Sequence, residues 1–166
     1  MNRALDAVVG GWQLTTLTTF QTGQPLAITM GNQRLADGNQ RPSVTCPNHQ
    51  SLTTGMSIHQ SSEFGMPYIN ANCFTDPGDQ QAGSAPRYFP NLRSDGIHTT
   101  DISVERIYKF GERGQIEIHG DCLNCTNTER FGLPDLGYGD STFGIISSTA
   151  TGALPRNIQL GARYQF

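Results

Sequence analysis

Apolar and polar residues alternate along four stretches of the chain, which is the pattern of β-strands that bury one face only. The stretches cover about residues 11–22, 100–110, 115–126 and 156–166. The last alternates up to its final residue, and its apolar positions are Ile158, Leu160, Ala162, Tyr164 and Phe166. No long stretch has a helical period. The pattern therefore predicts an all-β fold with about four antiparallel strands.

The connections between these strands are alternately long and short. Long loops are expected over about residues 30–99 and 129–155, whereas residues 111–114 carry a compact turn signal with glycine at both ends. A loop as long as the first is uncommon in a compact domain and indicates either a functional segment or a wrong assignment. Long outer loops, short turns and strands of about 9–11 residues are typical of an outer-membrane β-barrel.

Aromatic residues provide a second argument for a barrel. If the 111–114 turn is periplasmic, the ends of three strands place Trp12, Tyr108, Phe110, Tyr164 and Phe166 at one level. Such a level is expected of an interfacial aromatic girdle. Arg106 lies on the apolar face close to this level, where its side chain is expected to extend toward water.

An antiparallel soluble sandwich shows the same alternation and is the alternative reading. It would be a binding module with the long loop as its recognition surface. The two architectures differ in what covers the apolar face. A soluble module needs a second layer over Ile158, Leu160, Tyr164 and Phe166, whereas a barrel needs lipid.

Composition and charge exclude some functions. The net charge is −3 and the only lysine is Lys109, so no basic surface is available for nucleic acid. No motif of a hydrolase, metalloprotease or nucleotide-binding loop occurs. We expect no catalytic residue, no metal and no cofactor. The acidic pairs Asp76/Asp79 and Asp135/Asp140 lie in glycine-containing loops that could hold calcium, but solvated carboxylates are the simpler expectation.

Three polar residues of the third strand share the face opposite the apolar one. Glu117, His119 and Asp121 stand at alternate positions and would line the lumen of a barrel. They are candidates for a substrate path, and a polar lining without specificity is the alternative.

The four cysteines form two pairs in the sequence. Cys46 and Cys73 both lie in the first long loop, where an oxidising compartment would permit a disulfide; two free thiols are the alternative. Cys122 and Cys125 have C-x-x-C spacing at the end of a strand, so their side chains are expected to diverge, which argues against zinc or redox chemistry. A Cys/His enzyme, a third reading, would show one cysteine reacting much faster than the others.

Several stretches together resemble a known family. They are residues 10–14, 19–25 (TFQTGQP), 37–42 (DGNQRP), 72–74, 87–93 (RYFPNLR), 101–104, 109–110, 143–144 and 155–161 (PRNIQLG). In this order and spacing they resemble an Oar-like TonB-dependent outer-membrane receptor, the type with an N-terminal carboxypeptidase-regulatory-like domain. Residues 122–127 depart from the family's aromatic-rich stretch.

The resemblance implies transport across the bacterial outer membrane. The chain would supply barrel wall, lumen lining and two outer loops that capture a ligand. Such receptors have about 22 strands, a plug and a TonB-contacting segment, so we expect these residues to be the C-terminal segment of a longer receptor. The implied partners are outer-membrane lipid, the rest of the barrel and its plug, and the inner-membrane TonB complex acting through that plug. The barrel-assembly machinery would recognise the end of the last strand, including Tyr164 and Phe166.

Overall fold

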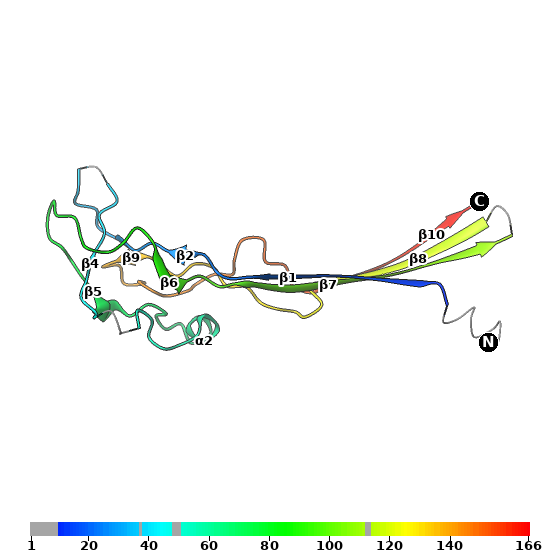
Figure 1. Cartoon of the computed structure of the whole chain (residues 1–166), viewed down its shortest axis with the longest axis horizontal. Coiled ribbons are helices and arrows are strands. Elements are labelled where there is room, and N and C mark those ends of the chain that lie inside the picture. The colour runs from blue at the N-terminus through cyan, green and yellow to red at the C-terminus, as the bar shows by residue number, and fades with distance from the viewer. Residues whose placement is uncertain (1–9, 37, 48–50, 112–113) are drawn as a thin grey trace. The chain divides into compact units, whose positions relative to one another are not determined.

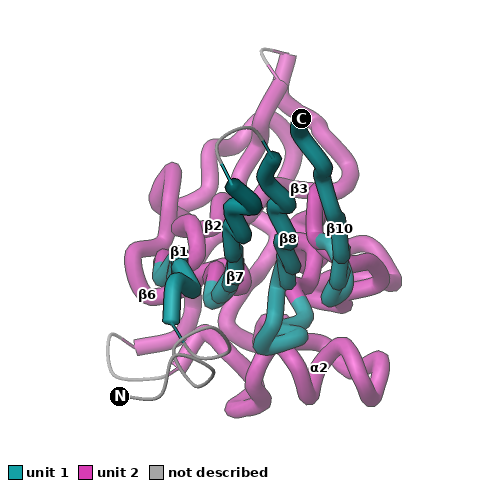
Figure 2. The backbone as a smooth tube through the Cα atoms, turned by 90° about the vertical axis from the view of Figure 1, so that its right-hand side faces the viewer, with its two compact units in different colours: residues 1–20, 98–129, 154–166 teal, residues 21–97, 130–153 magenta. Residues whose placement is uncertain are grey.

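The computed structural model describes residues 10–36, 38–47, 51–111 and 114–166. The chain forms two compact units, coloured separately in Figure 2. Unit 1 comprises residues 1–20, 98–129 and 154–166, and unit 2 comprises residues 21–97 and 130–153. Among the described residues, no helix is both long enough and apolar enough to cross a membrane.

Unit 1 is built mainly from four long strands (Figure 1). They are hydrogen-bonded in the order β1-β7-β8-β10, which are Trp12–Gln21, Ile97–Phe110, Gly114–Leu123 and Asn157–Gln165. Each strand lies within a few residues of one of the alternating stretches of sequence. The antiparallel pairings of β8 with β7 and with β10 confirm the predicted fold class.

The strand register sorts the side chains onto two faces. Ile116 on β8 pairs with Tyr108 on β7 and with Tyr164 on β10. Because successive side chains of a strand point to opposite faces, the even-numbered positions of these three strands share one face. This apolar face carries Ile102, Val104, Tyr108, Ile116, Ile118, Ile158, Leu160 and Tyr164. The odd-numbered positions form the polar face.

A tight turn joins β7 to β8. Phe110 is the last residue of β7 and pairs with Gly114, the first residue of β8. Gly111 follows with φ of 61°, a left-handed conformation that glycine adopts without steric cost. This is the position of the predicted hairpin; residues 112–113 of that turn lie outside the described residues.

Unit 1 has no hydrophobic core among its described residues. Every described hydrophobic residue that is buried belongs to unit 2, and the buried residues of unit 1 are Arg106 and Asn124. A soluble domain of this size buries most of its apolar surface in a core. The sheet therefore exposes an apolar face that nothing in its own unit covers.

Unit 2 contains the two segments expected to be long loops, and these are not structureless. Three short strand pairs form: β2 (Pro25–Leu26) with β6 (Phe89–Arg93), β3 (Thr29–Met30) with β9 (Gly137–Tyr138), and β4 (Ser43–Val44) with β5 (Phe74–Thr75). A short 3₁₀ helix, η1 (Ala71–Cys73), leads into β5. The segments expected to be long loops thus contain short strands that pair with one another rather than with the long strands.

The core of unit 2 is built around aromatic rings. The ring of Phe74 meets those of Phe89 and Phe143 edge-on, with centroids 5.9 and 6.0 Å apart. Tyr138 packs on Phe143 at 5.5 Å, and its hydroxyl donates to the carbonyl of Phe74 at 2.8 Å. Aliphatic residues complete the core, namely Leu26, Ile28, Ile69 and Leu92. These distances are the ones that aromatic pairs favour.

The helix of unit 2, α2 (Ile58–Phe64), begins and ends at clear signals. Ser57 accepts a hydrogen bond from the backbone N–H of Gln60, whose side chain in turn accepts from the backbone N–H of Ser57. This capping box satisfies two of the free donors at the helix start. Gly65 ends the helix with φ of 62°, which favours glycine.

A disulfide joins Cys46 to Cys73 within unit 2, with Cα atoms 4.7 Å apart. The backbone around it is also paired, because the N–H of Thr45 donates to the carbonyl of Cys73 at 2.9 Å. The bond therefore links the segment after β4 to the end of η1, beside the aromatic core.

The second cysteine pair corrects an expectation from the sequence. Cys122 and Cys125 do not diverge; they form a disulfide, with Cα atoms 5.5 Å apart. The reason is the backbone of Asn124, whose φ of 49° turns the chain back directly after β8. The side-chain amide of Asn124 holds this turn by donating to the carbonyls of Thr128 and Leu154 at 3.1 and 3.0 Å.

Candidate functional site

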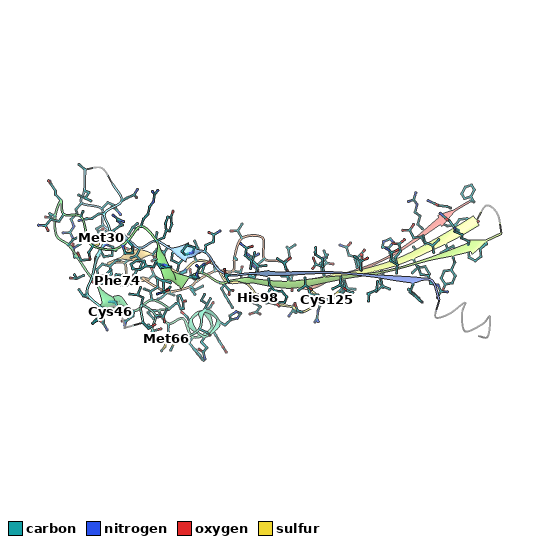
Figure 3. All side chains as sticks on the ribbon, viewed as in Figure 1. Met30, Cys46, Met66, Phe74, His98 and Cys125 are labelled. Carbon is teal, nitrogen blue, oxygen red and sulfur yellow. A yellow bond between two sulfur atoms is a disulfide. The ribbon has the colours of Figure 1, made fainter. Side chains whose placement is uncertain are left out.

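The apolar face of unit 1 is open across its whole width. Leu160, near the middle of β10, is 84% exposed, and Phe166 is 97% exposed. Side chains stand away from both faces of the long strands (Figure 3). Burying one large apolar side chain is worth about 1.5–3 kcal/mol, so a row of them exposed to water is strongly unfavourable. Such a face requires an apolar environment.

Aromatic residues gather at the end of the sheet next to the Gly111 turn. The rings of Tyr164 and Phe166 stack with centroids 5.9 Å apart, and Tyr108 lies in the same row as Tyr164. Trp12 joins them on this face, because its ring lies 5.2 Å from the guanidinium of Arg106. This arrangement is the expected girdle on three of the four strands.

Arg106 differs from its expected position. Its side chain does not extend away from the sheet; the residue is only 5% exposed, and its guanidinium lies 4.1 Å from the ring centroid of Tyr108. A cation held between aromatic faces is stabilised by the ring quadrupoles. The girdle therefore shelters the one charge on the apolar face of β7.

The polar face holds the three residues that the sequence singles out. Glu117, His119 and Asp121 follow one another along β8 on the same side of the sheet. The Nδ1 atom of His119 lies 3.9 Å from a carboxylate oxygen of Glu117. Asp121 accepts a hydrogen bond from the hydroxyl of Ser103 on β7. All three are partly exposed, as residues lining a water-filled space would be.

The strand register places two further residues next to the row formed by Glu117, His119 and Asp121. The sequence of β8 alone cannot reveal them. Glu105 on β7 is directly opposite His119, and Arg163 on β10 is directly opposite Glu117. Partners opposite each other in antiparallel strands have Cβ atoms about 4.5–5.5 Å apart. His119 therefore lies near the carboxylates of Glu117 and Glu105, on a face that carries both positive and negative side chains.

Gly161 is the partner of His119 on β10 and makes room for its ring. A Cβ atom at position 161 would collide with the Nε2 and Cε1 atoms of His119. The imidazole thus lies across the bare backbone of Gly161. An aromatic ring that covers a glycine on a neighbouring strand is a recognised way to stabilise that strand.

We expect Gly161→Ala to move the His119 ring off the sheet and toward the open side of the polar face. The stability change should be small, within about 1 kcal/mol, since the ring ends a flexible side chain and the backbone of residue 161 suits alanine. The measurement is the rate at which diethyl pyrocarbonate modifies His119, followed by mass spectrometry. The rate should rise severalfold.

Gly120→Ala is the matched control for this substitution. Its new Cβ atom would lie 3.1 Å from Leu160 on the apolar face and would not touch His119. The modification rate of His119 should then stay at the wild-type value. Equal rates in Gly161→Ala and in the wild type would contradict the packing of His119 on Gly161.

Metal binding finds no support on either face. Among the described residues, no group of three His, Cys, Asp or Glu side chains is placed to hold a metal ion. Asp76 and Asp79, a candidate calcium pair, instead bind the guanidinium of Arg34, at 2.6 Å in the case of Asp79. The hydrogen bond to Asp79 and the charge of Asp76 raise the pKa of Arg34. Asp135, of the other pair, accepts the backbone N–H of Gly137 at 3.0 Å.

Comparison with known families agrees with this geometry. The profile of a family described as an outer membrane beta barrel domain matches residues 1–159. The chain belongs to this family. No curated protein and no solved structure matches the chain significantly.

Membership explains the uncovered apolar face of this barrel domain. The domain belongs in the bacterial outer membrane. In barrels of that membrane, strands generally turn an apolar face to lipid and a polar face to the lumen, which is the division of faces seen in this sheet. The alternation of the sequence left a barrel and a soluble sandwich open. The family decides for the barrel, and the missing core of unit 1 agrees.

Proposed function

We propose that this barrel domain is part of a TonB-dependent outer-membrane receptor of the Oar-like type and that it serves transport. Unit 1 supplies barrel wall and lumen lining, with Glu117, His119 and Asp121 along the substrate path. Unit 2 supplies the outer segments that capture a ligand. The proposal rests on the resemblance of the sequence and on one structural observation, which is the two-faced sheet without a core.

The edges of the sheet support the participation of further strands. β1 and β10 are the outermost strands of the described sheet, and each has a single neighbour. In hydrocarbon, every unpaired backbone group costs several kcal/mol, so an open edge cannot persist there. We propose that other strands of the receptor pair with both edges. The plug and the inner-membrane TonB complex, which the resemblance implies, would complete the transporter.

The aromatic end of β10 supports a role in assembly. Tyr164 and Phe166 stack on each other at the girdle and are highly exposed. An exposed aromatic pair at the end of an amphipathic strand is accessible to a partner protein. We propose that the barrel-assembly machinery binds here before the sheet enters the membrane.

Cysteine substitution along β10 tests the barrel wall. The four native cysteines are paired in disulfides, so an introduced thiol is the reactive one. In outer-membrane preparations, Gln159→Cys and Arg163→Cys should react with a water-soluble maleimide, and Ile158→Cys and Leu160→Cys should be protected until detergent is added. Reaction of all four in the intact membrane would contradict the wall.

The receptor role needs a separate test in the native host. An epitope tag after Gly55, where open space surrounds the backbone, allows purification from gently solubilised membranes. We expect plug and TonB sequences in the purified material, identified by mass spectrometry. If the barrel is purified with neither plug nor TonB sequences, the TonB-dependent role is refuted. The proposal that β10 is part of a barrel wall would not be affected.

A further inference from the structure

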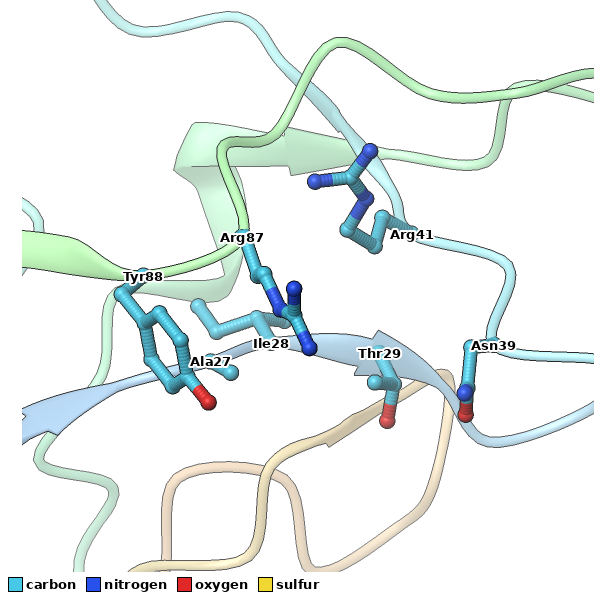
Figure 4. A pocket seen from close by; sticks show the side chains of 7 residues that line it. All are labelled: Ala27, Ile28, Thr29, Asn39, Arg41, Arg87 and Tyr88. Carbon is cyan, nitrogen blue, oxygen red and sulfur yellow. The ribbon is translucent and has the colours of Figure 1, made fainter.

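Unit 2 contains a cavity of about 450 Å³ that the barrel wall does not explain. Its floor is the segment 27–29, which runs from the end of β2 into the first residue of β3, and its sides carry Asn39, Arg41, Arg87 and Tyr88 (Figure 4). Pockets that bind small molecules have volumes of about 300–1,000 Å³. The size therefore suits a compact organic molecule.

Two arginines give this cavity its charge. Figure 4 shows the guanidinium of Arg87 over the floor strand, and Arg41 approaching from the neighbouring segment. Among the described residues, no acidic side chain lines the cavity and neither guanidinium forms a salt bridge. Arg34, by contrast, is neutralised by Asp76 and Asp79. Two uncompensated positive charges in a concave surface attract an anion.

The remaining lining residues indicate the rest of the ligand. Ala27 forms an apolar part of the floor above the buried Ile28, and the exposed ring of Tyr88 stands beside the guanidinium of Arg87, 5.9 Å away. Thr29 and Asn39 add a hydroxyl and an amide. Tyrosine presents an apolar ring on which a flat ligand can stack, and the guanidinium fork fits the two oxygens of a carboxylate or phosphate.

The cavity also brings together two distant parts of the sequence. Asn39 and Arg41 belong to the stretch 37–42, and Arg87 and Tyr88 belong to the stretch 87–93. Both stretches are among those that carry the family resemblance of the sequence. Neither belongs to the four strands of the barrel wall. The segment before Arg41 is tied down by Gln40, whose side-chain amide donates to the carbonyls of Gly78 and Gln81 at 2.8 and 2.9 Å. Arg41 is thus carried by an anchored segment.

We propose that this cavity binds a small organic oxyanion, a carboxylate or phosphate attached to an apolar or aromatic body. Arg41 and Arg87 hold the oxyanion, and Tyr88 with Ala27 contacts the body. The inference deepens the proposed function, since it names the class of ligand that unit 2 would capture. Only the biological role of this binding, as a step in transport, rests on the proposed function. Binding itself does not require transport.

Calorimetric titration of the full chain in detergent micelles at low salt tests the inference. The probes are phenyl phosphate, terephthalate, inorganic phosphate and the neutral 1,4-benzenedimethanol. At least one of the two aromatic anions should bind about tenfold more tightly than inorganic phosphate, and the neutral diol should not bind. Binding of inorganic phosphate as tightly as both aromatic anions, or of no anion at all, would overturn the proposal.

Substitutions locate the site. Arg41→Gln and Arg87→Gln should each weaken binding of the aromatic anion about tenfold or more, because each removes a charge-assisted hydrogen bond. Arg130→Gln removes the same charge from unit 2 outside the cavity and should change affinity less than twofold. Tyr88→Ala should weaken phenyl phosphate and leave inorganic phosphate unchanged. Equal weakening by Arg130→Gln and Arg87→Gln would show general attraction by charge and refute a built site.

The inference and the proposed function can fail separately. Loss of binding in the arginine variants, together with the alternating maleimide pattern on β10, supports both. Binding to the cavity, together with a barrel that is purified from the native host with neither a plug nor TonB, supports the cavity and refutes the TonB-dependent role. Absence of binding in a chain with the correct maleimide pattern refutes the cavity alone.

Discussion

Replacing Leu160 with arginine is expected to destabilise the membrane-inserted barrel by about 2–4 kcal/mol. Leu160 lies near the middle of β10 on the lipid face, and its side chain is almost fully exposed. An arginine there, four residues before Tyr164, would bring a charge into hydrocarbon without the aromatic rings that flank Arg106. The effect should therefore approach the value for the middle of the bilayer.

Urea unfolding of the barrel in lipid vesicles measures this effect. Gln159→Arg is the matched control, because it places the same charge one residue away on the polar face. The control should change stability by no more than about 0.5 kcal/mol. Equal destabilisation by the two substitutions would mean that β10 does not present one face to lipid.

The largest effect on unit 2 should come from Phe74→Ala, at about 3–5 kcal/mol. Phe74 is 4% exposed and packs edge-on against Phe89 and Phe143. It also directly follows Cys73, which the disulfide links to Cys46. Removing the ring leaves a cavity that these constrained neighbours cannot fill by moving inward.

Amide hydrogen exchange separates this effect from any change in the barrel wall. Protection should fall at the amides of β5 and β6 and stay constant in β8. Phe64→Ala, which removes an exposed ring at the end of α2, is the control and should leave protection within about 0.5 kcal/mol of the wild type. Unchanged protection of β5 in Phe74→Ala would refute an aromatic core in unit 2.

Local patterns explain why the strands of unit 1 could be predicted. A strand with one lipid face alternates over its whole length, so each of the four can be recognised without knowledge of its neighbours. The girdle follows as well, because Tyr108, Phe110, Tyr164 and Phe166 stand at the ends of such strands. The residues Glu117, His119 and Asp121 share a face by alternation alone. Their role along a substrate path remains a prediction.

Unit 2 could not be predicted in the same way. Its strand pairs contain few residues each, which is too short for an alternating pattern to emerge. The aromatic core joins Phe74, Phe89 and Phe143, which are far apart in the chain. The turn at Asn124 could not be predicted either. The left-handed backbone of this one residue brings the side chain of Cys125 to Cys122, whereas the sequence predicted that the two side chains diverge.

The all-β class, the apolar face, the polar face and the aromatic end could all be inferred from the sequence, because apolar and polar residues alternate along each strand. Only the tertiary structure decided which residues meet across strands and segments. It placed Glu105 and Gly161 beside His119, Arg106 between aromatic rings, and both Arg41 and Arg87 in the lining of one cavity. The physical reason is that register and long-range packing depend on the whole fold rather than on neighbouring residues.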